Sequence, residues 1–271
     1  MRDARRLLPL LALCLLVALA ACTKRPDVAP HGVAEATWRA YSSHAHAAAA
    51  AGPYRLGMSL RYTGNGDEDE RGRRVTALLW GNEDALRLDV NAGVGVVVAS
   101  VAEDDSHFML YAPREGKAYF HNGAQKPLLE VGVPLPLGLR ELSLLLRGCM
   151  GDLFGTDFDG KANMGNNGLV RYAVTGRLPG TLSLTPQGQV ALWEQKPSAD
   201  GAWKLEMLYD GEQDMAPRRV NVSHSKGKKA VVLVKERATP ATPYTDAQLR
   251  LHIPDGTPLL PLRTQARQPA L

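Results

Sequence analysis

The sequence predicts a mainly β (α+β) protein built on one large antiparallel sheet of about eleven strands, with short helices on one face. Short runs rich in valine and aromatic residues follow one another, separated by turn residues rather than helical crossovers, which is typical of antiparallel neighbours. A leucine-rich run, residues 134–152, carries Leu139, Leu142, Leu145 and Leu146 at helical spacing. Such a helix has to be buried against a sheet, and a sheet that curls around it forms an apolar cleft.

A further helix is predicted over residues 33–51, an alanine-rich segment that ends at Gly52 and Pro53. After it, the apolar period changes to two, as expected of a half-buried strand. One side of this strand carries Tyr54, Leu56, Met58, Leu60 and Tyr62. Later strands are predicted within 74–82, 85–90, 94–102, 107–113, 117–122, 180–195, 202–211, 218–237 and 247–256. Residues 151–180 are predicted to be a long connection, and the tail 258–271 to be irregular.

The N-terminus is typical of an export signal. Arg2, Arg5 and Arg6 form a basic head, Leu7–Leu19 is an apolar run, and two alanines supply a cleavage edge that ends the signal at residue 21. The apolar run is shorter than the roughly 20 residues needed to cross a bilayer as a helix. We therefore favour a cleaved signal over a retained membrane anchor.

The end of this signal, Leu19-Ala20-Ala21-Cys22, resembles the bacterial lipobox. The resemblance implies that Cys22 becomes the first mature residue and receives a diacylglycerol and an acyl chain, which attach the protein to a membrane permanently. The alternative is an ordinary signal-peptidase substrate with a free cysteine. Thr23 follows where Asp would favour inner-membrane retention, which implies the outer membrane. Residues 22–32 would form a short, proline-containing lipidated tether.

Charge and cysteine content argue against a nucleic-acid-binding protein and against a disulfide-stabilised fold. Without residues 1–21 the chain carries 32 − 3 = 29 basic and 28 − 1 = 27 acidic residues, a net charge of +2. The basic run 226–229 is short and is interpreted as a hairpin tip, so a nucleic-acid partner is not expected. Apart from Cys22, the mature chain has only Cys149, which is interpreted as a small buried core residue.

No motif for catalysis or for a cofactor is present, and the chain is not predicted to be an enzyme. His44 and His46 are two apart on a predicted helix and point in different directions, so they do not share a metal. Two acidic segments could be interpreted as calcium-binding sites: Asp67–Glu70, and the set Asp157, Asp159 and Asn163. Neither has the full ligand pattern of a calcium loop, and polar turns are favoured. No cofactor and no metal are therefore expected.

Four runs between residues 38 and 237 form a recognisable set: "LRLDV" with the turn "NAGVGVV", "FMLYAPREGKAYF", "LPLGLRELSLLLRG" and "GAWKLEMLYDGEQDMAPRRVNVSH". Together these runs resemble the LolA/LolB family of lipoprotein carriers. The resemblance implies an unclosed β-barrel with helices lying in its mouth. With the lipobox, the chain is more similar to LolB, the lipid-anchored outer-membrane receptor, than to the soluble carrier. In LolB a leucine in a protruding loop assists membrane insertion; here Val94 is the nearest apolar candidate.

The resemblance implies a division into a signal (1–21), a lipidated tether (22–32), a LolB-like half-barrel domain (33–237) and a C-terminal extension with one further strand (238–271). Acyl chains of lipoproteins or other lipids would occupy the cleft, delivered by a periplasmic LolA-like carrier, and the anchored domain would face the periplasm. The residues expected to line the cleft are Leu56, Met58, Leu60, Leu88, Leu110, Trp203, Leu205, Met207 and Tyr209. Leu139, Leu142 and Leu146 are expected to form its lid.

Each of these residues has an alternative interpretation as ordinary core packing, because the sequence does not fix which strand face points inward. Two other functions also stay open. One is a non-catalytic envelope assembly or structural lipoprotein that uses the same fold to bind a protein partner. The other, an enzyme, requires a polar cleft with a nucleophile and a base, for which the sequence carries no motif.

Overall fold

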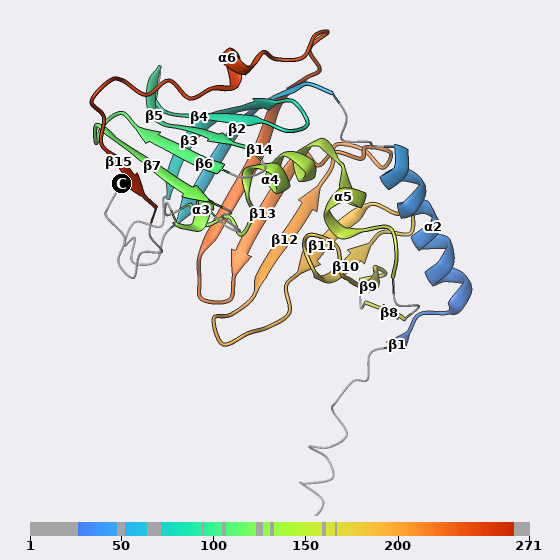
Figure 1. Cartoon of the computed structure of the whole chain (residues 1–271). Coiled ribbons are helices and arrows are strands. Elements are labelled where there is room, and N and C mark those ends of the chain that lie inside the picture. Colours follow the sequence, from blue (N-terminus) through green and yellow to red (C-terminus); the bar gives the residue numbers. More distant parts are fainter. Residues whose placement is uncertain are drawn as a thin grey trace, which may run out of the picture.

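Fifteen strands form one continuous sheet in the computed structural model (Figure 1). The structure describes residues 27–47, 52–63, 72–93, 95–104, 107–122, 127–130, 133–158, 161–165 and 167–262. In order across the sheet, the strands are β1 (Asp27–Val28), β8 (Ala162–Met164), β9 (Val170–Val174), β10 (Gly180–Leu184), β11 (Val190–Glu194), β12 (Trp203–Leu208), β13 (Arg219–His224), β14 (Lys229–Ala238), β2 (Tyr54–Thr63), β3 (Arg73–Gly81), β4 (Leu86–Ala92), β5 (Val96–Glu103), β6 (His107–Ala112), β7 (Lys117–Asn122) and β15 (Leu259–Pro261).

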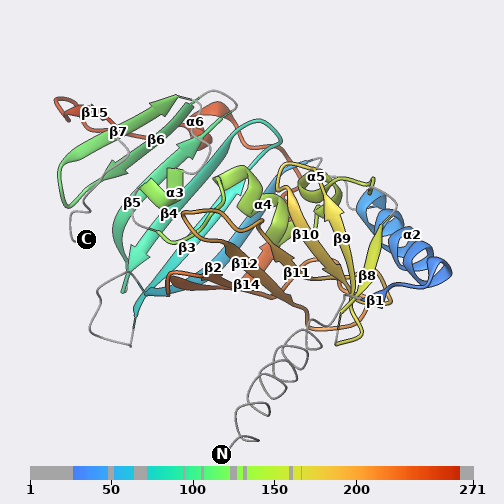
Figure 2. The ribbon, with the colours of Figure 1, turned by 90° about the horizontal axis from the view of Figure 1, so that it is seen from below.

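Two antiparallel meanders make up this sheet, β2 to β7 and β8 to β14, and they join where β14 pairs with β2. All neighbours are antiparallel except β15, which runs parallel to β7. The sheet bends around its concave face but does not close, because its edges are β1 and β15 (Figure 2). The predicted class, a mainly β protein with one unclosed sheet and short helices, is therefore confirmed.

Strand β2 shows why these residues form a half-buried sheet. Leu56, Met58 and Leu60 are buried in the core, whereas Arg55 and Arg61 on the opposite side are exposed. Because successive side chains of a strand point to opposite faces, this alternation places the even-numbered positions on the concave side. The structure thus settles the strand parity that the sequence leaves open.

The helices lie along the concave face and at one end of the sheet. They are α2 (His31–Ala47), α3 (Pro127–Glu130), α4 (Leu139–Arg147), α5 (Met150–Phe154) and α6 (Asp246–Leu249). Figure 2 shows α4 inside the bend of the sheet, and α2 beside α5 near β8 and β9. Trp38 on α2 donates from Nε1 to the carbonyl oxygen of Thr156 at 2.9 Å, and Tyr172 on β9 donates to that of Ala34 at 2.7 Å. These bonds fix α2 against the second meander.

The described part of the C-terminal extension, up to residue 262, crosses the convex face of the sheet. The side chain of Asn82 exchanges two hydrogen bonds with the backbone of Tyr244, and the Arg87 guanidinium donates to the carbonyl oxygen of Arg250. Arg87 alternates with the buried Leu86 and Leu88, so it lies on the convex side. In Figure 1 this segment passes over β2 to β5 before it reaches β15 beside β7.

Three sequence predictions need correction. The described residues form fifteen strands rather than about eleven. Residues 151–180 are not a simple connection, because they contain most of α5 and all of β8 and β9. The predicted strand 247–256 is wrong: its first residues belong to α6, and the last strand is β15, inside the tail expected to be irregular. Strands of two or three residues carry almost no periodic signal and form only when a neighbouring strand is in place.

The N-terminal boundary also differs. Helix α2 begins at His31, inside the segment predicted as tether, because the carbonyl oxygen of Pro30 accepts hydrogen bonds from the backbone N–H groups of Val33 and Ala34 at 2.9 and 3.0 Å. The signal and Cys22 lie outside the described residues, as does Val94. In the part of the chain that the structure describes, no helix has the length and apolar character needed to cross a membrane.

Candidate functional site

The concave face of the sheet and helix α4 form one apolar interior. All the residues predicted to line the cleft are buried in this core except Tyr209, which is partly buried and packs against it. The three predicted lid leucines, Leu139, Leu142 and Leu146, are at most 3% exposed and belong to the same cluster. The structure therefore brings the two predicted sets together, with α4 filling the space that the sheet encloses.

Helix α4 is buried on more than one side. The leucines at positions 139, 142, 144, 145 and 146, together with Ser143, are all buried. The helix is nevertheless amphipathic, because Arg140, Glu141 and Arg147 are only partly buried and give it one polar side. It is nine residues long and lies against the concave side of the open sheet (Figure 2).

A carboxylate anchors the start of α4. Glu103, at the end of β5, accepts hydrogen bonds from the backbone N–H groups of Leu139 and Arg140, both at 3.1 Å. Glu141 accepts another from Gly138 at 2.9 Å, which completes a capping arrangement. Burial raises the pKa of Glu103, and the two backbone hydrogen bonds only partly offset this effect.

The end of α4 is set by a glycine and an arginine. Gly148 adopts a left-handed φ of 81°, and its N–H points back at the carbonyl oxygens of Leu144 and Leu145. The Arg237 guanidinium, from the end of β14, donates from Nε to the Leu146 carbonyl oxygen at 3.3 Å and also bonds the carbonyl oxygen of Pro217. A cation at a helix C-terminus is favourable, so Arg237 stabilises both α4 and the adjacent loop.

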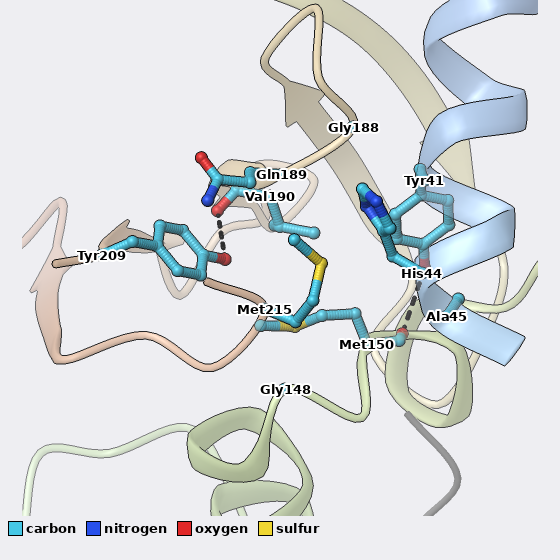
Figure 3. Close-up of a pocket in the computed structure, with 10 residues that line it drawn as sticks. All are labelled: Tyr41, His44, Ala45, Gly148, Met150, Gly188, Gln189, Val190, Tyr209 and Met215. Atoms are coloured by element: carbon cyan, nitrogen blue, oxygen red, sulfur yellow. Dashed lines mark hydrogen bonds between the residues drawn. The ribbon is translucent and has the colours of Figure 1, made fainter. Parts of the chain in front are cut away.

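Beyond Gly148, a small cavity separates α4 from α2 (Figure 3). Its volume of about 10 Å³ has room for no more than one water molecule. Tyr41 donates to the carbonyl oxygen of Gly155 at 2.8 Å and lies 3.1 Å from that of Met150, while Tyr209 donates to that of Val190 at 2.9 Å. Burial raises the pKa of both phenols, so they remain protonated donors that join α2, α5 and the strand ends.

A second pocket, of about 200 Å³, opens beside the other flank of α4. Its lining is formed by Tyr54, Asn82, Glu83, Leu86, Arg140, Ser143, Leu144, Arg147, Asp152 and Arg177. Three guanidinium groups and two carboxylates thus surround a floor made by two core leucines. This pocket is polar where the interior is apolar, and none of its arginines was predicted from the sequence.

The sequence did contain a signal for part of this arrangement. Glu141 lies three residues after Gly138 and accepts a hydrogen bond from its N–H, which is half of a capping box; Gly138 has no side chain to form the other half, so the sequence signal for the start of α4 is partial. Glu103, Arg237 and Arg177 carried no such signal, because each acts on a segment far away in the chain.

Among the described residues, the other candidates do not form a metal site or a reactive thiol. Cys149 is 2% exposed, and burial raises the pKa of its thiol, which confirms the core interpretation and leaves it a weak nucleophile. Among the described residues, no three histidines, cysteines or carboxylates lie close enough to hold a metal ion. The acidic segment 67–70 and Asp159 lie outside the described residues.

The fold and the interior define a class of protein: a mainly β chain whose single open sheet encloses an apolar space filled by a short helix. No protein-family model matches the sequence, and no curated protein sequence is similar to it. Among solved structures, a DUF1329 family protein from Desulfovibrio piger is similar, with a TM-score of 0.52 and 12% identity, over 80% of this chain and 96% of that one.

Two further structures overlap less well. A putative outer membrane lipoprotein-sorting protein domain from Vibrio parahaemolyticus has a TM-score of 0.47 and 11% identity over 78% of this chain and 97% of its own. A LolA superfamily protein from Nitrosomonas europaea has a TM-score of 0.43 and 8% identity, over 79% of this chain and 96% of its own. At such identities the likeness concerns the fold alone.

Proposed function

We propose that this chain is a lipid-binding protein of the bacterial envelope that takes up acyl chains in the space now filled by α4. The observation that carries the proposal is a helix of nine residues whose five leucines are buried inside an open sheet with an apolar concave face. In this proposal α4 is a lid, and the residues predicted to line the cleft contact the acyl chain when the lid moves.

The free-energy cost of moving α4 can be offset by burying an acyl chain, which supports a lid that a ligand displaces. Moving α4 away from the sheet exposes its leucines, which is unfavourable in water. An acyl chain that enters the vacated space compensates, because each buried methylene contributes about 0.8 kcal/mol. The polar attachments of α4 include Glu103 and Arg237 at its two ends and the Arg140 side chain, which bonds the turn between β3 and β4; none is strand pairing along its length. Such attachments can open without breaking the sheet.

The finer proposal is a LolB-like receptor, anchored in the outer membrane through Cys22, facing the periplasm, and receiving lipoproteins from a LolA-like carrier. It is supported by the lipobox and by the sequence runs that resemble the family. The insertion role of Val94 is part of this proposal. If depletion of the protein in its host leaves lipoproteins correctly placed in the outer membrane, the sorting role is wrong.

Acyl-chain binding is tested with the full chain carrying Cys22→Ala, so that no lipid of its own is attached. We expect saturable uptake of a fluorescent fatty acid, measured by its emission on titration. Met58→Gln places an unpaired amide in the interior and should weaken binding roughly tenfold. Leu249→Gln is the matched control, because Leu249 is also buried but lies outside the main core. Absence of saturable uptake by the parent chain contradicts the proposal.

A further inference from the structure

The 200 Å³ pocket beside α4 concentrates arginines from two parts of the chain. Arg140 and Arg147 are seven residues apart, so they lie on the same side of α4, two turns from each other. Arg177 reaches the pocket from the connection between β9 and β10. Arg177 is exposed and makes no hydrogen bond or ion pair with another residue in the described part of the chain. With the carboxylates of Glu83 and Asp152, the lining has one net positive charge.

A buried hydroxyl without a partner lies in the same pocket. Tyr54 is 4% exposed, and its hydroxyl makes no hydrogen bond of acceptable geometry to any described residue. Burial raises the pKa of Tyr54 to about 12, and the nearby Ser143 hydroxyl offsets this only in part, so the phenol stays protonated. Its ring is covered by the Arg147 guanidinium, whose Cζ is 4.3 Å from the ring centroid. A buried, unpaired hydroxyl costs free energy, and a ligand oxygen that accepts its hydrogen removes that cost.

The pocket also adjoins the apolar interior. Leu86 and Leu144 form part of its lining and belong to the main core, at 2% and 6% exposure. A ligand that fills both spaces must therefore be an amphiphile with a polar group beside its acyl chains. Phosphate oxygens match the polar lining, because guanidinium groups and a phenol hydroxyl are all donors.

We propose that Tyr54, Arg140, Arg147 and Arg177 bind the phosphate group of a phospholipid whose acyl chains enter the interior beneath α4. This inference rests on the proposed acyl-chain binding and specifies its ligand class. Arg140 now donates to the carbonyl oxygens of Glu83 and Asp84 at 2.6 and 3.0 Å, which fixes α4 to the turn between β3 and β4. A phosphate competes with those carbonyls for the guanidinium, so headgroup binding and lid opening are coupled.

The test compares three soluble probes on the full chain carrying Cys22→Ala, by isothermal titration calorimetry. Dihexanoylphosphatidylglycerol has both phosphate and acyl chains, dihexanoylglycerol has the acyl chains alone, and glycerol phosphate has the phosphate alone. We expect the phospholipid to bind roughly tenfold more tightly than the diacylglycerol. Equal affinity for the two overturns the phosphate site but leaves acyl binding intact. If glycerol phosphate binds and neither acyl-containing probe does, the result supports the phosphate site and contradicts acyl binding. If none of the three probes binds, both proposals are overturned.

Two variants separate the pocket from general destabilisation. Tyr54→Phe removes the unpaired hydroxyl, so it should leave stability unchanged or higher while it weakens phospholipid binding and spares diacylglycerol binding. Arg177→Ala should weaken phospholipid binding roughly tenfold. Arg39→Ala is the control, because Arg39 is an exposed arginine on α2 outside the pocket. If Arg39→Ala and Arg177→Ala have the same effect, the pocket is not the phosphate site.

Discussion

Gly148 decides where α4 ends and where the chain goes next. Its φ of 81° is in the left-handed region, and a Cβ at this position would lie 2.5 Å from the carbonyl oxygen of Met215. Two requirements therefore coincide at one residue, a backbone conformation that favours glycine and a close approach of another segment. Together they allow the end of α4 to pack directly against the loop that follows β12.

Replacing this glycine separates the two requirements. Gly148→Ala should lower the free energy of unfolding by about 2–4 kcal/mol, because the methyl group adds a backbone clash to the conformational cost. Gly227→Ala is the matched control: its φ is 90°, and nothing lies within 4 Å of the position that its methyl group would occupy. The control should cost only about 1–2 kcal/mol. Urea unfolding of both variants provides the comparison, and equal losses would contradict a role for the close approach.

Glu103, which caps the start of α4, makes the free energy of unfolding depend on pH. Burial raises its pKa above the ordinary value near 4.5. As the pH rises through the interval between these two values, the unfolded chain loses this proton before the folded chain does, so the free energy of unfolding falls. Above the raised pKa the contribution is constant. The sign is opposite to that of a carboxylate whose pKa is lowered by an ion pair.

Glu103→Gln removes this titration. We expect the decrease in unfolding free energy just above pH 4.5 to disappear in the variant, when urea unfolding is followed over a series of pH values. Glu212→Gln, at an exposed position after β12, is the control and should retain the profile of the parent chain. Parallel profiles for the parent and for Glu103→Gln would show that this carboxyl does not titrate as the structure implies.

At the scale of elements, α4 and β15 illustrate two different origins of structure. The leucine spacing of α4 predicted the helix, and its glycine at position 148 predicted the end. Strand β15 has three residues, all exposed, with Leu259 at 53% and Leu260 at 37%. It exists because β7 offers unpaired backbone groups along the sheet edge. No local pattern predicts such a strand.

Removing β15 should therefore affect the edge more than the core. A chain truncated after Gly256 loses the parallel pairing with β7 and leaves that edge exposed. We expect little loss of stability but concentration-dependent self-association, measured by sedimentation velocity, because an unpaired edge strand is a template for another chain. A chain that ends at residue 262 keeps β15 and should show no more self-association than the parent chain. Self-association of both truncations to the same extent would contradict this account.

For the whole molecule, the decisive contact is the pairing of β14 with β2, which joins the two meanders into one open sheet. Sequence reasoning predicted most of the strands on either side and the class of fold. It also predicted the residues of the interior, because apolar residues at period two mark one face of a strand whichever way that face points. It did not predict the polar pocket, since Tyr54, Arg140 and Arg177 are brought together only by the curl of the sheet.

The sequence by itself thus determined the type of each long element, the apolar face of each strand, the leucine-rich helix α4 and the lipobox-like segment, since local spacing carries all of these. The tertiary structure alone decided which strand faces point inward, the very short strands β1, β8 and β15, the course of the C-terminal extension over the convex face, and the arginine pocket beside α4. The physical reason is that pairing and pocket formation depend on residues that are distant in sequence, and no local period encodes their contact.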